Sequence, residues 1–167
     1  MGLLAWLGLK QGGTYPNLDA LLAELRRALP DDESVVLRYI AAVVALLVQV
    51  ASADGRFTER EEQAIRELLT HIHGLKPADI DAVARGLEGK VSELTEEERA
   101  LCVRELKAIC DGRERVEVIR LLAKVAAADG KLTPAERAEL RQVALDLAVP
   151  AEEIAAAENV AAENETS

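Results

Sequence analysis

Four carboxylates stand out in this sequence because they recur in one short pattern at two places. The pattern is Asp-Gly-x-(Phe or Leu)-Thr-x-x-Glu, and its copies begin at residues 54 and 129. Carboxylate oxygens are the ligands that hard divalent cations prefer in proteins. If the two copies lie side by side in the fold, they could therefore supply one shared cation site. Its candidate metal ligands are Asp54, Glu61, Asp129 and Glu136.

The pattern also overlays the second half of an EF-hand calcium loop, where Asp, Gly, an apolar residue and Glu follow the same spacing. The first half of that loop does not match. Its ligand positions would fall on Val50 and Ser52 in one copy and on Val125 and Ala127 in the other. Because valine and alanine have no side-chain oxygen, neither copy can form the complete cage of an EF-hand.

A structural role explains much of the same pattern. Thr58 with Glu61, and Thr133 with Glu136, have the form of a capping box, in which the two residues satisfy each other's backbone amides at a helix start. The glycine suits a left-handed turn. The aspartate follows a helix, whose C-terminal dipole disfavours an anion, so an Asx-turn, a cation or a basic partner should compensate. Three interpretations stay open: a turn and cap, a shared cation site, and an acidic surface for a protein partner.

The other reactive side chains do not form a catalytic or metal-binding pattern. His71 and His73 are two residues apart, whereas a helical zinc pair needs a spacing of four. Cys102 and Cys110 are eight residues apart on one expected helix, a rise of about 12 Å that is too long for a disulfide. The sequence contains no Cys-x-x-Cys pair, nucleophile elbow or phosphate-binding glycine loop. We therefore predict a protein that is not an enzyme, with no cofactor unless a divalent cation binds.

The elements that must position these residues are helices. Most of them start at Ser, Thr, Asn or Pro and stop at Gly or Pro, which are the usual helix boundary residues. No stretch alternates apolar and polar residues as a half-buried strand does. The predicted fold class is all-α, a single domain of about eight helices. The expected helices cover residues 18–29, 34–53, 58–73, 77–88, 95–110, 113–128, 133–148 and 150–161.

The repeated pattern belongs to a longer internal duplication. Residues 50–58 (VASADGRFT) match residues 125–133 (VAAADGKLT), 75 positions later. Apolar residues of the flanking helices match at the same offset, with the three- and four-residue spacing of a buried helix face. We expect a helix–turn–helix–short-helix unit twice, at about 34–88 and 113–161, related by a pseudo-two-fold axis. The expected division is an apolar leader at 1–17, flexible or packed, a helical domain at 18–161 and an acidic disordered tail at 162–167.

Composition limits the classes of partner. The 167 residues carry 20 basic and 30 acidic side chains, for a net charge of -10, and only 2% are aromatic. An acidic chain with few aromatic rings disfavours nucleic-acid binding. The apolar run at residues 39–48 is too short for a bilayer, which needs about 20 residues. We expect a cytoplasmic protein with an unidentified protein partner. The N-terminal segment around Trp6 is a candidate for weak association with a membrane surface, and the oligomeric state is not indicated.

The two copies of Ala-Asp-Gly-x-(apolar)-Thr-x-x-Glu, each between two apolar helices, resemble the TerB-like family. That family includes tellurite-resistance TerB proteins and the N-terminal region of the membrane-anchored DnaJ-like co-chaperone DjlA. The resemblance covers about residues 34–161. It implies an all-helical, internally duplicated domain, a link to stress response or tellurite resistance, and acidic residues that bind metal, which by position would be Asp54, Glu61, Asp129 and Glu136.

We therefore expect a stand-alone, non-enzymatic TerB-like module in a cytoplasmic stress, tellurite or metal response. It would present the duplicated acidic turn to a divalent cation or to a protein partner. The alternative is a purely structural or scaffolding helical domain that binds no metal.

Overall fold

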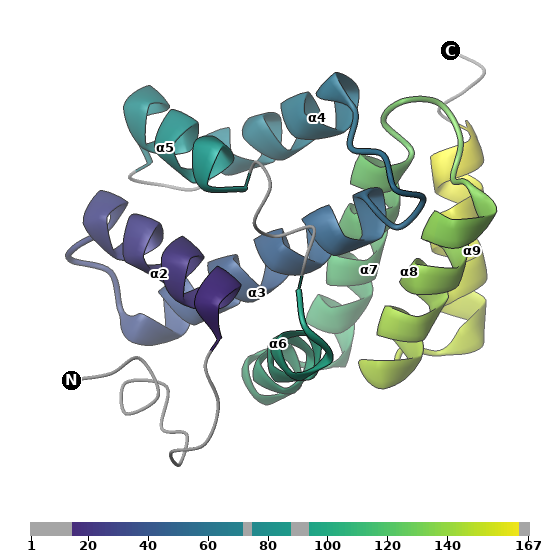
Figure 1. The fold of residues 1–167 in the computed structure, drawn as a ribbon. Coiled ribbons are helices and arrows are strands. Elements are labelled where there is room, and N and C mark those ends of the chain that lie inside the picture. Colours follow the sequence, from purple (N-terminus) through teal and green to yellow (C-terminus); the bar gives the residue numbers. More distant parts are fainter. Residues whose placement is uncertain (1–14, 72–74, 88–93, 164–167) are drawn as a thin grey trace.

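The structure is a computed structural model that describes residues 15–71, 75–87 and 94–163. These residues form eight α-helices and no strand, which confirms the predicted fold class (Figure 1). Residues 1–14, which include Trp6, as well as His73 and residues 164–167, lie outside the described residues. Residues 16–17 of the predicted leader belong to the first helix, and residues 162–163 of the predicted tail belong to the last one. The helices are α2 (Pro16–Ala28), α3 (Ser34–Ala51), α4 (Glu59–Thr70), α5 (Pro77–Leu87), α6 (Glu96–Ile109), α7 (Gly112–Ala126), α8 (Pro134–Asp146) and α9 (Ala151–Glu163).

Helix α3 lies at the centre of the fold, where α2, α4, α6, α7 and α8 pack against it (Figure 1). Every residue from Ile40 to Val48 is buried, because the whole circumference of this part of the helix is covered by neighbours. By length and composition alone α3 could cross a membrane, yet 67% of that apolar window is buried within the fold. The apolar run at residues 39–48 therefore lies in a buried core helix of this fold.

Four helices begin with a complete capping box. The cap residues are Thr58, Thr95, Asp111 and Thr133, and each pairs with the glutamate three positions later. The spacing Thr-x-x-Glu at residues 58–61, 95–98 and 133–136 predicts the three boxes that begin with threonine. As a sequence, Asp111-Gly112 predicts the stop of the helix expected at 95–110. In the structure Asp111 caps the start of α7, and Gly112 is the first residue of that helix. Extended backbone at Cys110 ends α6 instead.

The first helix begins two residues earlier than its sequence suggests. Pro16 is the first helical residue and Tyr15 the cap, because proline lacks the amide hydrogen that would be unpaired there. Asn17 is therefore not a cap but a residue of the first turn, and its side-chain amide donates to Glu98. The same elements follow one another in α3–α5 and in α7–α9: a helix, a turn, a second helix and a third helix. The pseudo-two-fold relation between them stays a prediction.

Candidate functional site

Two acidic turns join α3 to α4 and α7 to α8. Gly55 has a φ of 82° and Gly130 a φ of 135°, in the region that residues with a Cβ atom rarely adopt. Their amides donate to the carbonyl oxygens of Ser52 at 2.9 Å and Ala127 at 3.1 Å, so each turn folds back onto the end of the helix before it. The glycines of the repeated pattern are thus required by the backbone, as predicted.

The aspartate of the first turn is compensated locally. Asp54 Oδ1 accepts a hydrogen bond of 2.9 Å from the amide of Arg56, which is the expected Asx-turn. Both Asp54 and Asp129 are exposed. The apolar residues that follow, Phe57 and Leu132, pack against the core and anchor the turns there. The two aspartates therefore stand on fixed turns with their carboxylates turned to solvent.

The glutamates of the pattern are almost completely buried. Glu61 and Glu136 are each 1% exposed, and their Oε2 atoms accept from the amides of Thr58 at 2.7 Å and Thr133 at 2.8 Å. The second oxygen of Glu61, Oε1, is buried and has no hydrogen-bond partner among the described residues. A buried polar atom without a partner is destabilising and rare in folded proteins, so this oxygen calls for an explanation.

The fold brings the two turns together. Helix α3 packs against α8, and α4 packs against α7, so the ends that carry the turns are neighbours (Figure 1). One hollow beside them is lined from both sides, with Ala53 in the turn after α3 and Ala135 at the start of α8. Another is lined by Arg60 of α4 and by Gly130 of the second turn. The two turns are therefore neighbours, which is the first condition for a shared site.

The carboxylates of the two turns affect one another electrostatically. Burial raises the pKa of Glu61 to about 7 against the lowering effect of its bonds with Thr58, and Asp129 and Glu136 of the second turn raise it further. Burial likewise raises the pKa of Glu136, and Asp54 and Asp129 add to that rise. Electrostatic repulsion therefore links the carboxylates of one turn to those of the other.

Carboxylates can affect one another's pKa over distances much longer than a bond between a metal ion and its ligand. No group of three or more His, Cys, Asp or Glu side chains in the described part of the chain is arranged to hold a metal ion. Calcium needs oxygen ligands at about 2.3–2.6 Å, so the carboxylates would have to move closer to one ion. The residue types fit such an ion, because it would neutralise the repulsion and give Glu61 Oε1 a partner.

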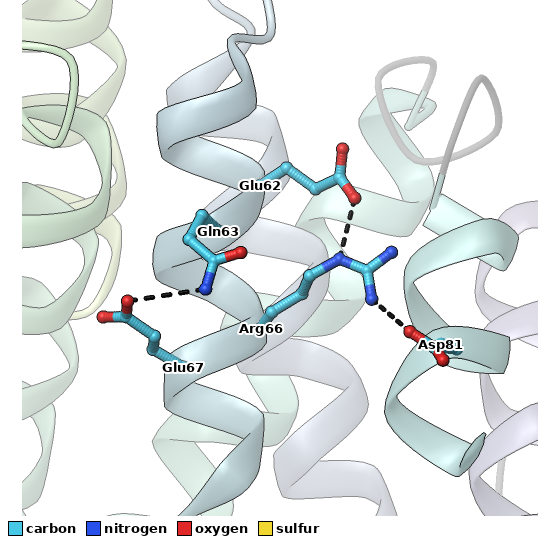
Figure 2. Close-up of polar contacts among 5 residues, drawn as sticks. All are labelled: Glu62, Gln63, Arg66, Glu67 and Asp81. Carbon is cyan, nitrogen blue, oxygen red and sulfur yellow. Dashed lines mark hydrogen bonds and ion pairs between the residues drawn. The ribbon is translucent and has the colours of Figure 1, made fainter. Parts of the chain in front are cut away.

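The arginines that match in the two copies do not neutralise the turns. Arg66 pairs with Glu62 of its own helix at 2.8 Å and with Asp81 of α5 at 2.6 Å (Figure 2). Arg141 donates two hydrogen bonds, of 2.7 and 3.0 Å, to Glu158 of α9. Arg66 therefore links α4 to α5, and Arg141 links α8 to α9. Neither arginine pairs with a carboxylate of the acidic turns in these contacts.

Sequence reasoning missed the tertiary role of Glu98, although it predicted its capping box. Glu98 is 0% exposed. Its Oε1 accepts from the amides of Asn17 at 3.0 Å and Leu18 at 3.4 Å, while Oε2 accepts from the Asn17 side chain at 2.9 Å and from the Thr95 amide at 3.1 Å. One carboxylate thus caps α6 and α2 together. Its partners on α2 lie about 80 residues earlier in the chain, so no local signal could reveal them.

Cys102, Cys110 and His71 do not belong to the acidic turns, and each has a structural setting of its own. Cys102 and Cys110 are free and buried, and burial raises the pKa of the Cys102 thiol far above its ordinary value. A thiol held in its protonated form is a poor nucleophile. His71 is exposed, and its Nδ1 lies 2.8 Å from the carbonyl oxygen of Glu67 in its own helix. These contacts agree with the structural interpretation of the three residues.

Comparison with known proteins adds the family. A family model described as Tellurite resistance protein TerB matches residues 40–159, which is more than half of the chain. The chain belongs to the TerB family. The region matched by the TerB model begins within α3 and includes both acidic turns, whereas α2 precedes it. No curated protein and no solved structure matches the chain.

Proposed function

We propose that this TerB-family chain is a non-enzymatic helical module of a cytoplasmic stress or metal response, and that its paired acidic turns bind one divalent cation. The ligands would be Asp54, Glu61, Asp129 and Glu136. The observation that carries the proposal is Glu61, a buried carboxylate whose Oε1 has no hydrogen-bond partner among the described residues and whose pKa is raised by acidic residues of the other turn as well as by burial. A cation is the ligand that removes both penalties at once.

The donor set indicates the kind of cation. All four side chains offer carboxylate oxygens, which favour hard ions such as Ca²⁺, Mg²⁺ or Mn²⁺ over Zn²⁺. Binding would draw the first turn towards the second and change the acidic surface that both present. A protein partner could bind the acidic surface in one state and not in the other. Cation binding would then control the protein interaction that we expect of this module.

The test is a titration of the chelator-stripped protein with Ca²⁺, Mg²⁺, Mn²⁺ and Zn²⁺, followed by calorimetry and thermal unfolding. We expect one equivalent of a hard cation to bind and to raise the free energy of unfolding by about 2.7 kcal/mol at a hundredfold excess over Kd. Replacement of both aspartates, Asp54→Asn with Asp129→Asn, should remove that stabilisation, because it leaves too little charge to hold the ion.

The matched control is Glu114→Gln, which changes an exposed capping-box glutamate at the start of α7. It should leave cation binding unchanged. Absence of binding by the native chain, or equal binding by the double aspartate variant, would sink the proposal.

A purely structural role is the second candidate, and a specific observation favours it. Both turns end in complete capping boxes, and Asp54 already has an Asx-turn partner, so most of the repeated residues have a local structural use. If the double aspartate variant loses stability in chelator while no cation affects the native chain, the turns serve the fold alone.

A further inference from the structure

Helix α2 lies before the part of the chain that the family model matches. It ends at Ala28, and residues 29–33 (Leu-Pro-Asp-Asp-Glu) connect it to α3, whereas the matched region begins at residue 40. Proline and the charged residues of this short link do not continue either helix. The helix is therefore a separate element that is placed on the rest of the fold by its side-chain contacts.

Those contacts fill a groove between other helices. α2 packs against α3 and α5, and Figure 1 shows it beside both of them, on the side of the molecule opposite α9. At the end of the groove, Glu98 of α6 accepts from the first backbone amides of α2. The groove thus recognises a helix by a leucine face and by its N-terminal turn. The buried leucines are Leu18, Leu21, Leu22, Leu25 and Leu29.

The seam between α2 and its groove is imperfect. A cavity of about 20 Å³ remains where Leu18 and Leu22 meet Arg38 of α3 and Cys102 of α6. In the described part of the chain four buried side-chain atoms have no hydrogen-bond partner, and two of them, Asp19 Oδ1 and Arg38 Nε, lie on these facing helices. A void and unpaired polar atoms both weaken packing.

The seam also contains a charge conflict. Asp19 lies in the first turn of α2, where burial and the carboxylate of Glu98 both raise its pKa. The same carboxylate that accepts from the α2 backbone therefore repels an α2 side chain. A helix with a neutral residue in place of Asp19 would fit this groove better than α2 does.

We propose that α3, α5 and α6 form a helix-binding groove, that α2 is its built-in occupant, and that α2 leaves as a unit to admit a partner helix. The partner helix has leucines spaced as in α2 and an uncharged first turn. The leucine face supplies the apolar contact, and Glu98 holds the free amides of the incoming helix as it holds those of α2. This surface is separate from the acidic turns and does not depend on a cation.

The opening of α2 is tested by hydrogen exchange of the full chain, read by mass spectrometry. We expect amides of α2 to exchange at least about tenfold faster than those of α8, because α2 opens without global unfolding. Asp19→Asn should slow exchange in α2 alone, since it removes the repulsion, and Glu98→Gln should accelerate it. Equal exchange of α2 and α8, or no change in α2 with Asp19→Asn, would overturn the proposal.

The groove itself is tested with a labelled peptide of residues 15–30 that carries Asp19→Asn. We expect it to bind Leu25→Ala at least about tenfold more tightly than the native chain, because that substitution weakens the tethered helix but leaves the groove intact. A peptide with the same residues in scrambled order is the control. Equal binding of the scrambled peptide, or no gain with Leu25→Ala, would overturn the groove as a binding surface.

Discussion

Glu98 and Glu61 occupy the same position in the same local motif, yet their carboxylates differ in hydrogen bonding outside that motif. Both are capping-box glutamates three residues after a threonine, with exposed fractions of 0% and 1%. At Glu98 the second oxygen accepts from the first backbone amides of α2, whereas at Glu61 it has no partner among the described residues. The charges of Asp129 and Glu136 lie near Glu61 instead.

The difference shows that the backbone amide of a capping box occupies only one of the two oxygens of a buried carboxylate. One oxygen is occupied by the local amide in both cases, and the tertiary neighbours decide what the other oxygen meets. A helix N-terminus is a favourable partner for an anion, since its amides carry partial positive charge. Two carboxylates are unfavourable partners, and this is why we assign cation binding to the acidic turns and helix binding to the region of Glu98.

The largest expected effect is at Glu98. Glu98→Ala removes the acceptor of two helix starts and leaves the amides of α2 without their partner, so we expect the free energy of unfolding to fall by about 3 kcal/mol. Urea denaturation at neutral pH measures this change. A loss no larger than that of Glu114→Ala, which removes an exposed capping-box carboxylate, would contradict a special role for Glu98.

The second effect is a pH dependence at Glu61, measured in chelator. The folded state holds the pKa of Glu61 at about 7, above its ordinary value of 4.5, so the folded state favours the protonated form. Its stabilising contribution is complete below pH 4.5 and is lost as pH rises through 7. Glu61→Gln cannot ionise, and we expect its stability relative to the native chain to rise by about 1–3 kcal/mol between pH 4.5 and 8.

Urea denaturation of both proteins at pH 4.5 and at pH 8 gives this difference directly. Glu114→Gln reports the generic consequence of replacing a capping-box carboxylate by an amide. If Glu61→Gln follows the native chain at both pH values, Glu61 does not experience the repulsion on which the comparison with Glu98 rests.

The third effect concerns the turns that carry the aspartates. Gly55→Ala and Gly130→Ala each place a Cβ atom on backbone with positive φ, so we expect each to destabilise the fold by about 1 kcal/mol or more, although space beside both is open. Gly112→Ala is the matched control, because Gly112 is helical and equally uncrowded. Thermal unfolding should leave Gly112→Ala unchanged or slightly stabilised. Equal losses at the three glycines would contradict the strained turns.

The smallest effect is expected where ion pairs are partly exposed. Arg66→Ala breaks the pairs with Glu62 and Asp81, but charges within reach of solvent are screened and gain little from pairing, so we expect a loss of about 0.5 kcal/mol. The loss should shrink further in 1 M salt. A loss comparable to that of Glu98→Ala would show that α4 and α5 depend on this pair far more than its exposure indicates.

Much of the fold could be predicted because its signals are local. The boxes at Thr58, Thr95 and Thr133 involve residues three positions apart, and the glycines act through their own backbone. The sequence misplaces two helix starts, at Asn17 and at Asp111, and both errors are also local. Pro16 can start the first helix before Asn17, and Asp111 can either follow one helix or cap the next. The family followed from the repeated turn, which the match over residues 40–159 supports.

The sequence by itself determined which residues form helices, which glutamates cap them and which turns repeat, because these depend on hydrogen bonds within three or four residues. The tertiary structure alone decided what each buried carboxylate faces. Glu98 meets Asn17 across 81 residues, and Glu61 meets the charges of a turn about 75 residues later. Such contacts depend on how α3 packs against its neighbours, and no spacing within a single helix encodes that packing.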